Sequence, residues 1–373
     1  MSRRFCSLRL ARVWIHDFRN YREAFLAPAP EGVTVLYGAN GQGKTNFLEA
    51  VAYCAALTSF RRAPREALVR RSAAVARVRT EAYWNRGQFS VDIELPVTGR
   101  ERLWLNGKAR PARASSTPLR ASVFGPDDLD LVKGGPEVRR RLIDELGTAL
   151  VPGYERVRHD FERVLRQRAA LLRRLGEAPR SSELASLDVW DERLAPLGED
   201  LARRREELVG ELAPLLVSAY SDLGGGQSEV QASYRRSWTG EFLAALKGVR
   251  DEDVRRRATT LGPQRDEVDL VIGGLPARTH RSQGEQRSLA LALRLAAHRL
   301  VATWLGEWPV LLLDDVFSEL DPARSAALTR HLPPGQILVT CTDRLPREVS
   351  PALEIRVAAG QLQGPERACG PGP

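Results

Sequence analysis

The glycine-rich stretch GANGQGKT at residues 38–45 constrains the fold of this 373-residue chain more than any other feature. It fits the pattern G-x-x-x-x-G-K-[ST], whose glycines let the backbone wrap a phosphate with its N–H groups pointing inward. The run GVTVLY (32–37) predicts a buried strand before the loop, and TNFLEAVAYCAAL (45–57) predicts a helix after it. Strand, loop and helix place a helix N-terminus against an anion. A chance glycine-rich turn would lack these flanks, so we expect a nucleoside triphosphate site.

Every residue of this loop is a candidate nucleotide contact. The Lys44 ammonium supplies a positive charge for the outer phosphates, and the Thr45 hydroxyl is a ligand for Mg²⁺. The expected contacts are Gly38, Ala39, Asn40, Gly41, Gln42, Gly43, Lys44 and Thr45.

Two acids follow a second buried run, VLLLDDVFSELD at 310–321. A strand this apolar is typical of the middle of a parallel sheet, and ligands bind at the carboxyl ends of such strands. We therefore expect Asp314 to help hold Mg²⁺, and Asp315 to orient or deprotonate the attacking water as the catalytic residue. The alternative is a solvated strand end.

The segment SQGEQRSLALALRLAAHRL (282–300) predicts a helix that begins after Ser282. Ser282 and Glu285 match a capping box, which would explain the serine on structural grounds alone. A Ser-x-Gly turn at a helix N-terminus is also an anion site. The order of P-loop, Ser-x-Gly helix, acidic strand and SELD resembles that of ABC-type ATPases. The resemblance implies that Ser282, Gln283 and Gly284 reach the γ-phosphate held by a second subunit, and that Glu319 and Asp321 form the D-loop.

The remaining patterns predict an α/β protein: an ABC-type P-loop ATPase head, with a parallel sheet and an antiparallel β annex, plus a helical arm domain. Alternating residues at 5–26 and 79–106, with an NGK turn signal at 106–108, predict the annex. Two amphipathic stripes between 154 and 215 predict antiparallel helices, unless these lie flat on the sheet. We expect the head at 1–135 and 250–365, the arm at 136–249 and a disordered tail at 366–373.

Composition adds a basic balance, with 56 Lys and Arg against 47 Asp and Glu and a formal net charge of +9. This favours polyanions such as nucleic acid or acidic membrane surfaces, although an arginine-rich codon bias would also produce it. Four scattered cysteines include no C-x-x-C pair, and Cys54 is expected to be a free buried thiol. The cysteines indicate neither a disulfide framework nor a zinc site, so we expect a protein of the reducing cytoplasm. Neither a signal peptide nor a membrane span is evident.

Seven segments in register closely resemble the RecF family of DNA replication and repair ATPases, which is related to SMC-type proteins. They are FRNY (18–21), FGPDDLDLVKGGPEVRRRLID (124–144), VLRQRAALL (164–172), VWDERLAPLG (189–198), GPQRDE (262–267), SQGEQRSLALALRLA (282–296) and LLLDDVFSELD (311–321). The resemblance implies ATP and Mg²⁺ as cofactors, an ATP-dependent homodimer, and weak DNA-dependent ATPase activity. It also implies binding of single-stranded, gapped and duplex DNA, RecO and RecR as partners in loading recombinase at gaps, and support of SOS induction.

The chain departs from the family pattern at Ala170, where Asn is usual, and at Glu285, where Gln is common. Thr342 lies near the place of the histidine switch of ABC transporters, which RecF proteins also lack. Asp315 takes the place of the usual catalytic Glu. A shorter carboxylate lies farther from the water, so we expect slow hydrolysis, which suits a timed clamp.

Candidate DNA contacts are five arginine clusters, each of which would equally suit a solvated face or an ion-pair network. They are Arg61–Arg62, Arg70–Arg71, Arg139–Arg141, Arg203–Arg205 and Arg255–Arg257. The chain has no groove-reading motif, so binding should be insensitive to sequence. Arg19 and Asn20 are candidate adenine contacts, unless they merely complete a strand end.

Three other functions compete with a DNA-binding ATPase. A transport ATPase would need a docking surface for membrane subunits, and the long helical insert argues against it. An SMC protein would need hundreds of residues of coiled coil. A binding adaptor with a vestigial ATP site conflicts with the intact Lys44, Thr45, Asp314 and Asp315.

Overall fold

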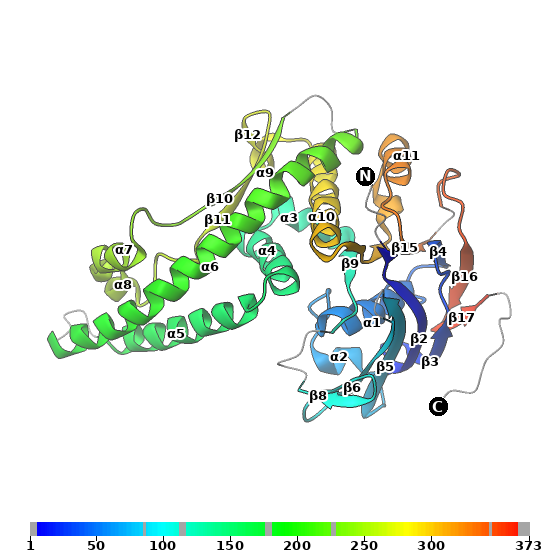
Figure 1. The fold of residues 1–373 in the computed structure, drawn as a ribbon, viewed down its shortest axis with the longest axis horizontal. Helices are drawn as coiled ribbons and strands as arrows, with labels where there is room; N and C mark the ends of the chain where they lie inside the picture. The colour runs from blue at the N-terminus through cyan, green and yellow to red at the C-terminus, as the bar shows by residue number, and fades with distance from the viewer. Residues whose placement is uncertain are drawn as a thin grey trace. The chain divides into compact units, whose positions relative to one another are not determined.

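The computed structural model describes residues 6–84, 87–111, 117–175, 181–224, 229–342 and 345–364 (Figure 1). The chain divides into two compact units. Unit 1 comprises Met1–Asp128, Asp222–Gly224 and Val301–Pro373, and unit 2 comprises Leu129–Ser221 and Gly225–Leu300. The expected disordered tail at 366–373 lies outside the described residues.

The first sheet of unit 1 has six strands in the order β17-β16-β4-β15-β14-β9. The strands are β4 (Gly32–Tyr37), β9 (Ala121–Phe124), β14 (Val310–Asp314), β15 (Gln336–Cys341), β16 (Leu353–Ala358) and β17 (Gln361–Gln363). All neighbours pair in parallel except β16 and β17. Every residue of β14 and β15 is buried, so the two acids at the end of β14 follow a central strand, as expected.

The second sheet of unit 1 is the antiparallel annex, in the order β3-β2-β5-β6-β7-β8. Its strands are β2 (Arg9–Phe18), β3 (Tyr21–Leu26), β5 (Val75–Trp84), β6 (Gly87–Pro96), β7 (Arg102–Leu105) and β8 (Lys108–Arg110). The predicted β7–β8 turn is present, with positive φ at Asn106 (51°) and Gly107 (71°). The alternating run at 5–26 contains two strands, because the chain reverses at Arg19–Asn20.

Helix α1 (Lys44–Ala56) packs against strands of both sheets and carries buried residues into a core that they share. The rest of unit 1 is short: α2 (Arg65–Leu68), α11 (Pro322–Arg330), the 3-10 turns at Pro126–Leu129 and Val316–Glu319, and the parallel pair β1 (Cys6–Ser7) and β13 (Glu307–Trp308). Cys54 is a free buried thiol, as expected. This packing fixes the N-terminus of α1 at the carboxyl edge of the parallel sheet.

Unit 2 contains the two predicted long helices, α5 (Tyr154–Arg174) and α6 (Ser181–Asp222). Its other helices are α3 (Asp130–Lys133), α4 (Pro136–Leu150), α7 (Phe242–Gly248), α8 (Arg250–Arg256), α9 (Ala277–His280) and most of α10 (Gln283–Leu305). A small antiparallel sheet is formed by β10 (Val230–Arg235), β11 (Glu267–Ile272) and β12 (Leu275–Pro276). No helix in the described part of the chain is long and apolar enough to cross a membrane.

The division differs from the predicted boundaries, because residues 250–300 group with the helices rather than with the sheets of unit 1. Two long-range contacts explain this. Strand β11 pairs with β10 along its whole length, and the Arg139 guanidinium of α4 makes two 2.9 Å hydrogen bonds to the Glu267 carboxylate, 128 residues away.

A fully buried charge cluster joins three helices of unit 2. The Arg168 side chain on α5 donates to Asp191 on α6 (2.6 Å), and to Asp253 on α8 (2.7 Å) and Thr259 (2.8 Å). The side chains of Arg168, Asp191 and Asp253 have no exposed surface. Charges this deep are stable only while all partners are present.

We therefore expect Asp191→Ala to lower the free energy of unfolding by about 3–5 kcal/mol, because it leaves part of the buried Arg168 guanidinium without a partner. Asp200→Ala is the control, since Asp200 makes only surface pairs with Arg203 and Arg204 and should cost about 1 kcal/mol or less. Urea unfolding followed by circular dichroism measures both. Equal losses would show that the buried cluster contributes no special stability.

Candidate functional site

The loop between β4 and α1 needs its glycines for backbone reasons. Gly43 has a φ of 115°, and a Cβ there would lie 2.6 Å from the Asn20 side chain. A Cβ on Gly38 would lie 2.3 Å from the Val357 carbonyl oxygen. The loop can therefore follow this path only with glycine at both positions.

Neighbouring side chains hold the loop from outside. The Asn20 amide donates to the Gln42 carbonyl (2.9 Å), and the Tyr21 hydroxyl donates to the Gly43 carbonyl (2.9 Å). Lys44 is buried, and its ammonium donates to the carbonyls of Gly38 (2.7 Å) and Ala39 (3.1 Å). The cation thus lies against the concave side of the loop.

Thr45 and Asp314, the two expected metal ligands, meet although they are 269 residues apart. The Thr45 hydroxyl donates to Asp314 Oδ1 at 2.8 Å, and the Thr340 hydroxyl donates to the same oxygen at 2.8 Å. Burial raises the pKa of Asp314, and these two hydrogen bonds oppose the effect. Thr340 lies directly opposite Asp314 in the β14–β15 pair, which explains the contact.

Asp315 is held in a strained backbone conformation beside them. Its φ is 54°, and its amide donates to the Thr340 hydroxyl (2.9 Å). Thr342 donates to Asn40 (2.8 Å) and lies 3.4 Å from Asp315 Oδ2. Asp315 Oδ1 is buried and has no hydrogen-bond partner among the described residues. A buried carboxylate oxygen in this state is available to a further donor, such as a water molecule or a cation.

Arg61 has a role that the sequence did not reveal. Its guanidinium donates to Asn46 Oδ1 (3.3 Å), and its charge lowers the pKa of Asp314 slightly against the dominant effect of burial. The Ser59 hydroxyl, which accepts from the Arg61 amide, fixes this segment. One cation of this expected DNA-contact cluster thus also acts electrostatically on Asp314, and its contact with DNA stays a prediction.

Arg19 and Asn20 are both engaged within the protein. Arg19 donates twice to the fully buried Glu49 carboxylate (2.7 and 2.8 Å) and once to the Ala67 carbonyl (2.9 Å). A surface cavity of about 470 Å³ adjoins the loop at this place. It is lined by Arg19, Asn20, Asn46, Glu66, Ala67, Val69 and Arg71.

The Ser-x-Gly turn lies in unit 2 and is capped as the sequence allowed. The Ser282 amide and hydroxyl donate to Glu285 Oε2 (2.9 and 2.7 Å), and the Glu285 amide donates back to the Ser282 hydroxyl (3.3 Å). Ser282 and Gln283 are exposed, and Gly284 is half-buried in the first turn of α10. The capping explanation therefore holds, and it leaves the outer face of this turn accessible.

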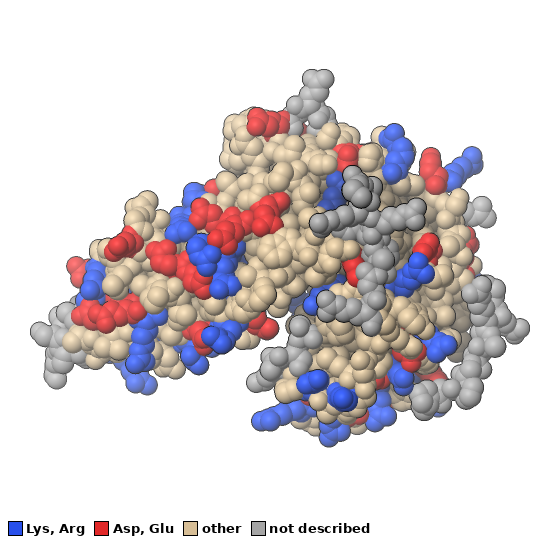
Figure 2. Space-filling view, viewed as in Figure 1, with Lys and Arg blue, Asp and Glu red and all other residues tan. Residues whose placement is uncertain are grey.

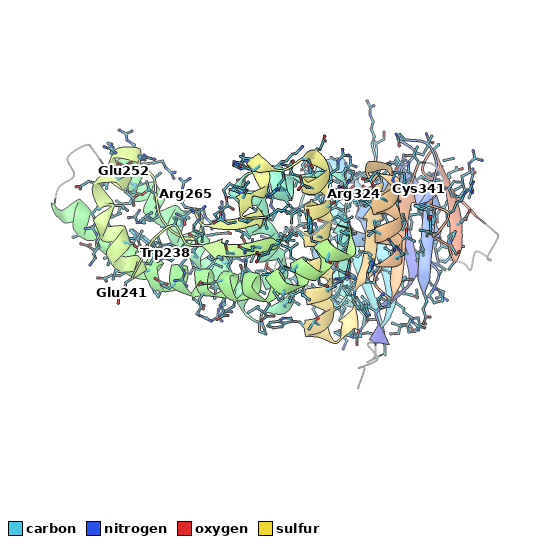
Figure 3. All side chains as sticks on the ribbon, turned by 90° about the horizontal axis from the view of Figure 1, so that it is seen from above. Trp238, Glu241, Glu252, Arg265, Arg324 and Cys341 are labelled. Atoms are coloured by element: carbon cyan, nitrogen blue, oxygen red, sulfur yellow. The ribbon has the colours of Figure 1, made fainter. Side chains whose placement is uncertain are left out.

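Of the two expected D-loop residues, Asp321 caps α11 by accepting from the Arg324 amide at 2.9 Å, and it also pairs with the Arg324 side chain. Figure 3 labels Arg324 on this helix. The Glu319 side chain lies outside what the structure describes.

Most of the candidate DNA contacts are paired with acids. Two pairs are nearly buried, and others lie on the surface, where Figure 2 shows basic and acidic side chains interspersed over unit 2. The pairs are Arg70–Asp17, Arg139–Glu267, Arg203–Asp200, Arg204–Asp200, Arg205–Asp144, Arg255–Glu252 and Arg256–Glu252. The ion-pair alternative accounts for these arginines, while Arg62, Arg71, Arg141 and Arg257 have no paired carboxylate among the described residues.

Comparisons with known proteins agree with this geometry. A family model described as the RecF/RecN/SMC N terminal domain matches residues 9–353. The chain is 42% identical over 343 residues to the DNA replication and repair protein RecF of Streptomyces avermitilis, covering 87% of this chain and 91% of the relative. It is 40% identical over 334 residues to RecF of Acidothermus cellulolyticus, covering 86% and 90%.

Solved structures show the same relationship. The recombination mediator protein RecF with ATP, of the RecFOR pathway, superposes with a TM-score of 0.87 at 25% identity, covering 97% of this chain and 99% of that one. The Smc head domain of Pyrococcus furiosus superposes with a TM-score of 0.55 at 14% identity, covering 95% of each chain, which shows a shared fold. The predicted ABC-type head fold is confirmed.

Asp314→Asn should raise the thermal unfolding midpoint at neutral pH. Burial favours the neutral form of this carboxyl and raises its pKa, so the charged form at neutral pH costs folding free energy. Each kcal/mol gained corresponds to about 1–2 °C in a chain of this size. Asp321→Asn is the control and should lower the midpoint, because hydrogen bonds from Arg324 favour the charged carboxylate and lower the pKa of Asp321. A lower midpoint for Asp314→Asn would contradict the assignment.

Arg19→Ala should destabilise unit 1 by about 3–5 kcal/mol, since it leaves the buried Glu49 carboxylate without its cation. Adding Glu49→Gln should restore part of this loss. We expect the double variant to bind ATP as wild type does, because the Arg19 donors are used inside the protein. Calorimetric titration with ATP decides the point: weaker binding by a stable double variant would place Arg19 at the base.

Proposed function

The chain belongs to the RecF/RecN/SMC family, within it to the RecF proteins, and we propose that it binds and slowly hydrolyses ATP to control its binding to DNA in replication and recombinational repair. The observation that carries this proposal is the meeting of Thr45, Asp314 and Asp315 at the mouth of the glycine-rich loop. Side chains from opposite ends of the chain converge there on one small polar site. The matched RecF relatives are named for DNA replication and repair, and one solved RecF contains ATP.

The residues fit a nucleotide with Mg²⁺. The loop from Gly38 to Thr45 would cradle the phosphates with its backbone amides, and Lys44 would exchange its loop carbonyls for phosphate oxygens. Thr45 and Asp314 offer the hard oxygen ligands that Mg²⁺ prefers. When bound, Mg²⁺ supplies positive charge that neutralises the phosphate oxygens. The cavity beside Asn20 is the place we propose for the base, with no contact from the Arg19 donors, which Glu49 and Ala67 already use.

Asp315 is the residue we propose to act on the attacking water. Its unpartnered Oδ1 provides an acceptor for a water proton, and Thr342 steadies the carboxylate from the other oxygen. An Asp reaches less far than a Glu, so positioning of the water should be poor and hydrolysis slow. Slow hydrolysis gives a long-lived ATP-bound state, as a timed clamp requires.

We propose that Ser282, Gln283 and Gly284 complete the ATP site of a second copy. The turn is exposed, stands at the N-terminus of a 23-residue helix, and is held by Glu285, so it presents a preformed polar surface. Glu319 and Asp321 are the proposed D-loop residues of the same interface. ATP would then stabilise a homodimer, because only the dimer contains the complete site.

The net charge of +9 supports binding to the DNA backbone. Exposed arginines without a paired carboxylate, such as Arg62 and Arg257, are better candidates than the ion-paired clusters. We propose binding to single-stranded, gapped and duplex DNA without sequence preference, in the cytoplasm. RecO and RecR as partners, recombinase loading and SOS support follow from the family, and the RecF structure named for the RecFOR pathway supports the partners.

The first experiment measures binding of labelled gapped DNA with and without ATP at two salt concentrations. ATP should tighten wild-type binding, and affinity should fall with salt by a log–log slope of about −0.9 per phosphate contacted. Lys44→Met removes the phosphate cation and Ser282→Arg blocks the proposed trans contact, so both should lose the ATP effect.

Ser221→Arg is the matched control, since it adds the same charge at an exposed position away from the turn and should retain the ATP effect. Binding that is absent, or indifferent to ATP in every variant, would overturn the proposal in favour of an adaptor or a transport ATPase.

A further inference from the structure

A cavity of about 480 Å³ lies between α5 and α6 of unit 2, within the roughly 300–1,000 Å³ range of small-ligand sites. Apolar groups and the Trp190 ring line it together with two guanidinium groups and one amide. The lining residues are Arg163, Val164, Gln167, Trp190, Arg193 and Leu197. This combination of a flat aromatic ring, cations and an amide is suited to a ligand that is both planar and anionic.

The cavity is built on rigid supports. The residue after Gln167 is Arg168 and the residue after Trp190 is Asp191, and these two form the buried 2.6 Å pair that locks α5 to α6. The lining residues belong largely to segments 164–172 and 189–198, which carry part of the family resemblance yet have no role in the proposed ATP site. Their buried members fix the helices, and their outer members line the cavity.

The cations at the rim are free to meet a ligand. Arg193 lies over the Trp190 ring at 5.5 Å from its centroid, and no described carboxylate pairs with it. Among the residues that the structure describes, Arg163 pairs only with Asp160 on the same helix, and its side chain is 68% exposed, so this pair is weak. Both guanidinium groups are therefore available for an anion at little cost.

The charge of α5 favours a polyanion. The helix has seven Arg against three Asp and Glu, and only Arg168 is neutralised in the interior. An acidic peptide without aromatic residues would use these cations but not the ring. A nucleotide would use all three kinds of group: the base would replace the Arg193 guanidinium on the Trp190 ring, its edge would meet Gln167, and the phosphates would meet Arg163 and the displaced Arg193.

We propose that this cavity binds one unpaired nucleotide of a DNA strand and so distinguishes single-stranded and gapped DNA from duplex. Paired bases are stacked inside the duplex and cannot enter, whereas an unpaired base can turn out of its strand. The proposal deepens the proposed DNA-binding function and rests on it. It places the recognition of a gap on the α5–α6 cavity, apart from the ATP site.

The test uses the full chain with ATP, a duplex containing a gap with one 2-aminopurine, and a continuous duplex. In wild type, stacking on Trp190 should quench the 2-aminopurine, and gapped DNA should bind more tightly than duplex. Trp190→Ala should weaken gapped-DNA binding about 5- to 150-fold, the ratio for about 1–3 kcal/mol of stacking, with the quench lost and duplex binding unchanged. Trp190→Phe should retain most of the preference.

Arg193→Gln should also reduce the preference for gapped DNA. Arg166→Gln is its control, because it removes a charge from α5 outside the cavity and should affect both DNAs equally. Unchanged gapped-DNA binding and quenching in Trp190→Ala would overturn the proposal. The proposal would also be overturned if an Asp- and Glu-rich peptide containing Phe bound at Trp190 and the oligonucleotide did not.

Failure of the underlying function gives a different result. If ATP does not change the DNA affinity of wild type, the proposed ATP-controlled function is wrong. Whether the preference for gapped DNA depends on Trp190 still shows whether the cavity binds an unpaired nucleotide.

Discussion

The contact between the Thr45 hydroxyl and Asp314 Oδ1 is the constraint on which the candidate site depends. It requires that β4, β15 and β14 lie side by side in parallel and in one register, which places Thr340 opposite Asp314. A slip of one residue would turn the carboxylate to the other face of the sheet. Burying this carboxylate raises its pKa and costs stability, which fits the proposed role of Asp314 in the ATP site better than a role in folding.

Local patterns in the sequence predicted the elements well, for a physical reason. The glycine-rich loop, the NGK turn and the Ser282–Glu285 cap are each determined by residues within a few positions of one another. Long-range partners are not determined in this way. Glu267 binds Arg139 across 128 residues, and no local pattern indicates that residues 250–300 join unit 2. The same limit hid the interactions of Arg61, which donates to Asn46, 15 residues away, and influences the pKa of Asp314 on another element.

Arginine illustrates why a count of basic residues does not locate the positive surface. The 56 Lys and Arg include Arg168 and Arg205, which are used in the interior against Asp191, Asp253 and Asp144. Each of these holds helices together and is unavailable to a phosphate. The cations that are free to meet a ligand are fewer than the total count and lie at particular places. Those beside an aromatic ring indicate more about a ligand than the net charge does.

The two proposals are linked through the dimer, although each can be tested without the other. If Ser282 of one copy completes the ATP site of another, ATP binding favours the dimer, and each dimer contains two α5–α6 cavities. Two weak sites that bind one strand act at a high effective concentration, so their combined affinity exceeds that of either by far more than a factor of two. ATP would then tighten binding to a gap without touching the strand, and hydrolysis would release it by separating the two cavities.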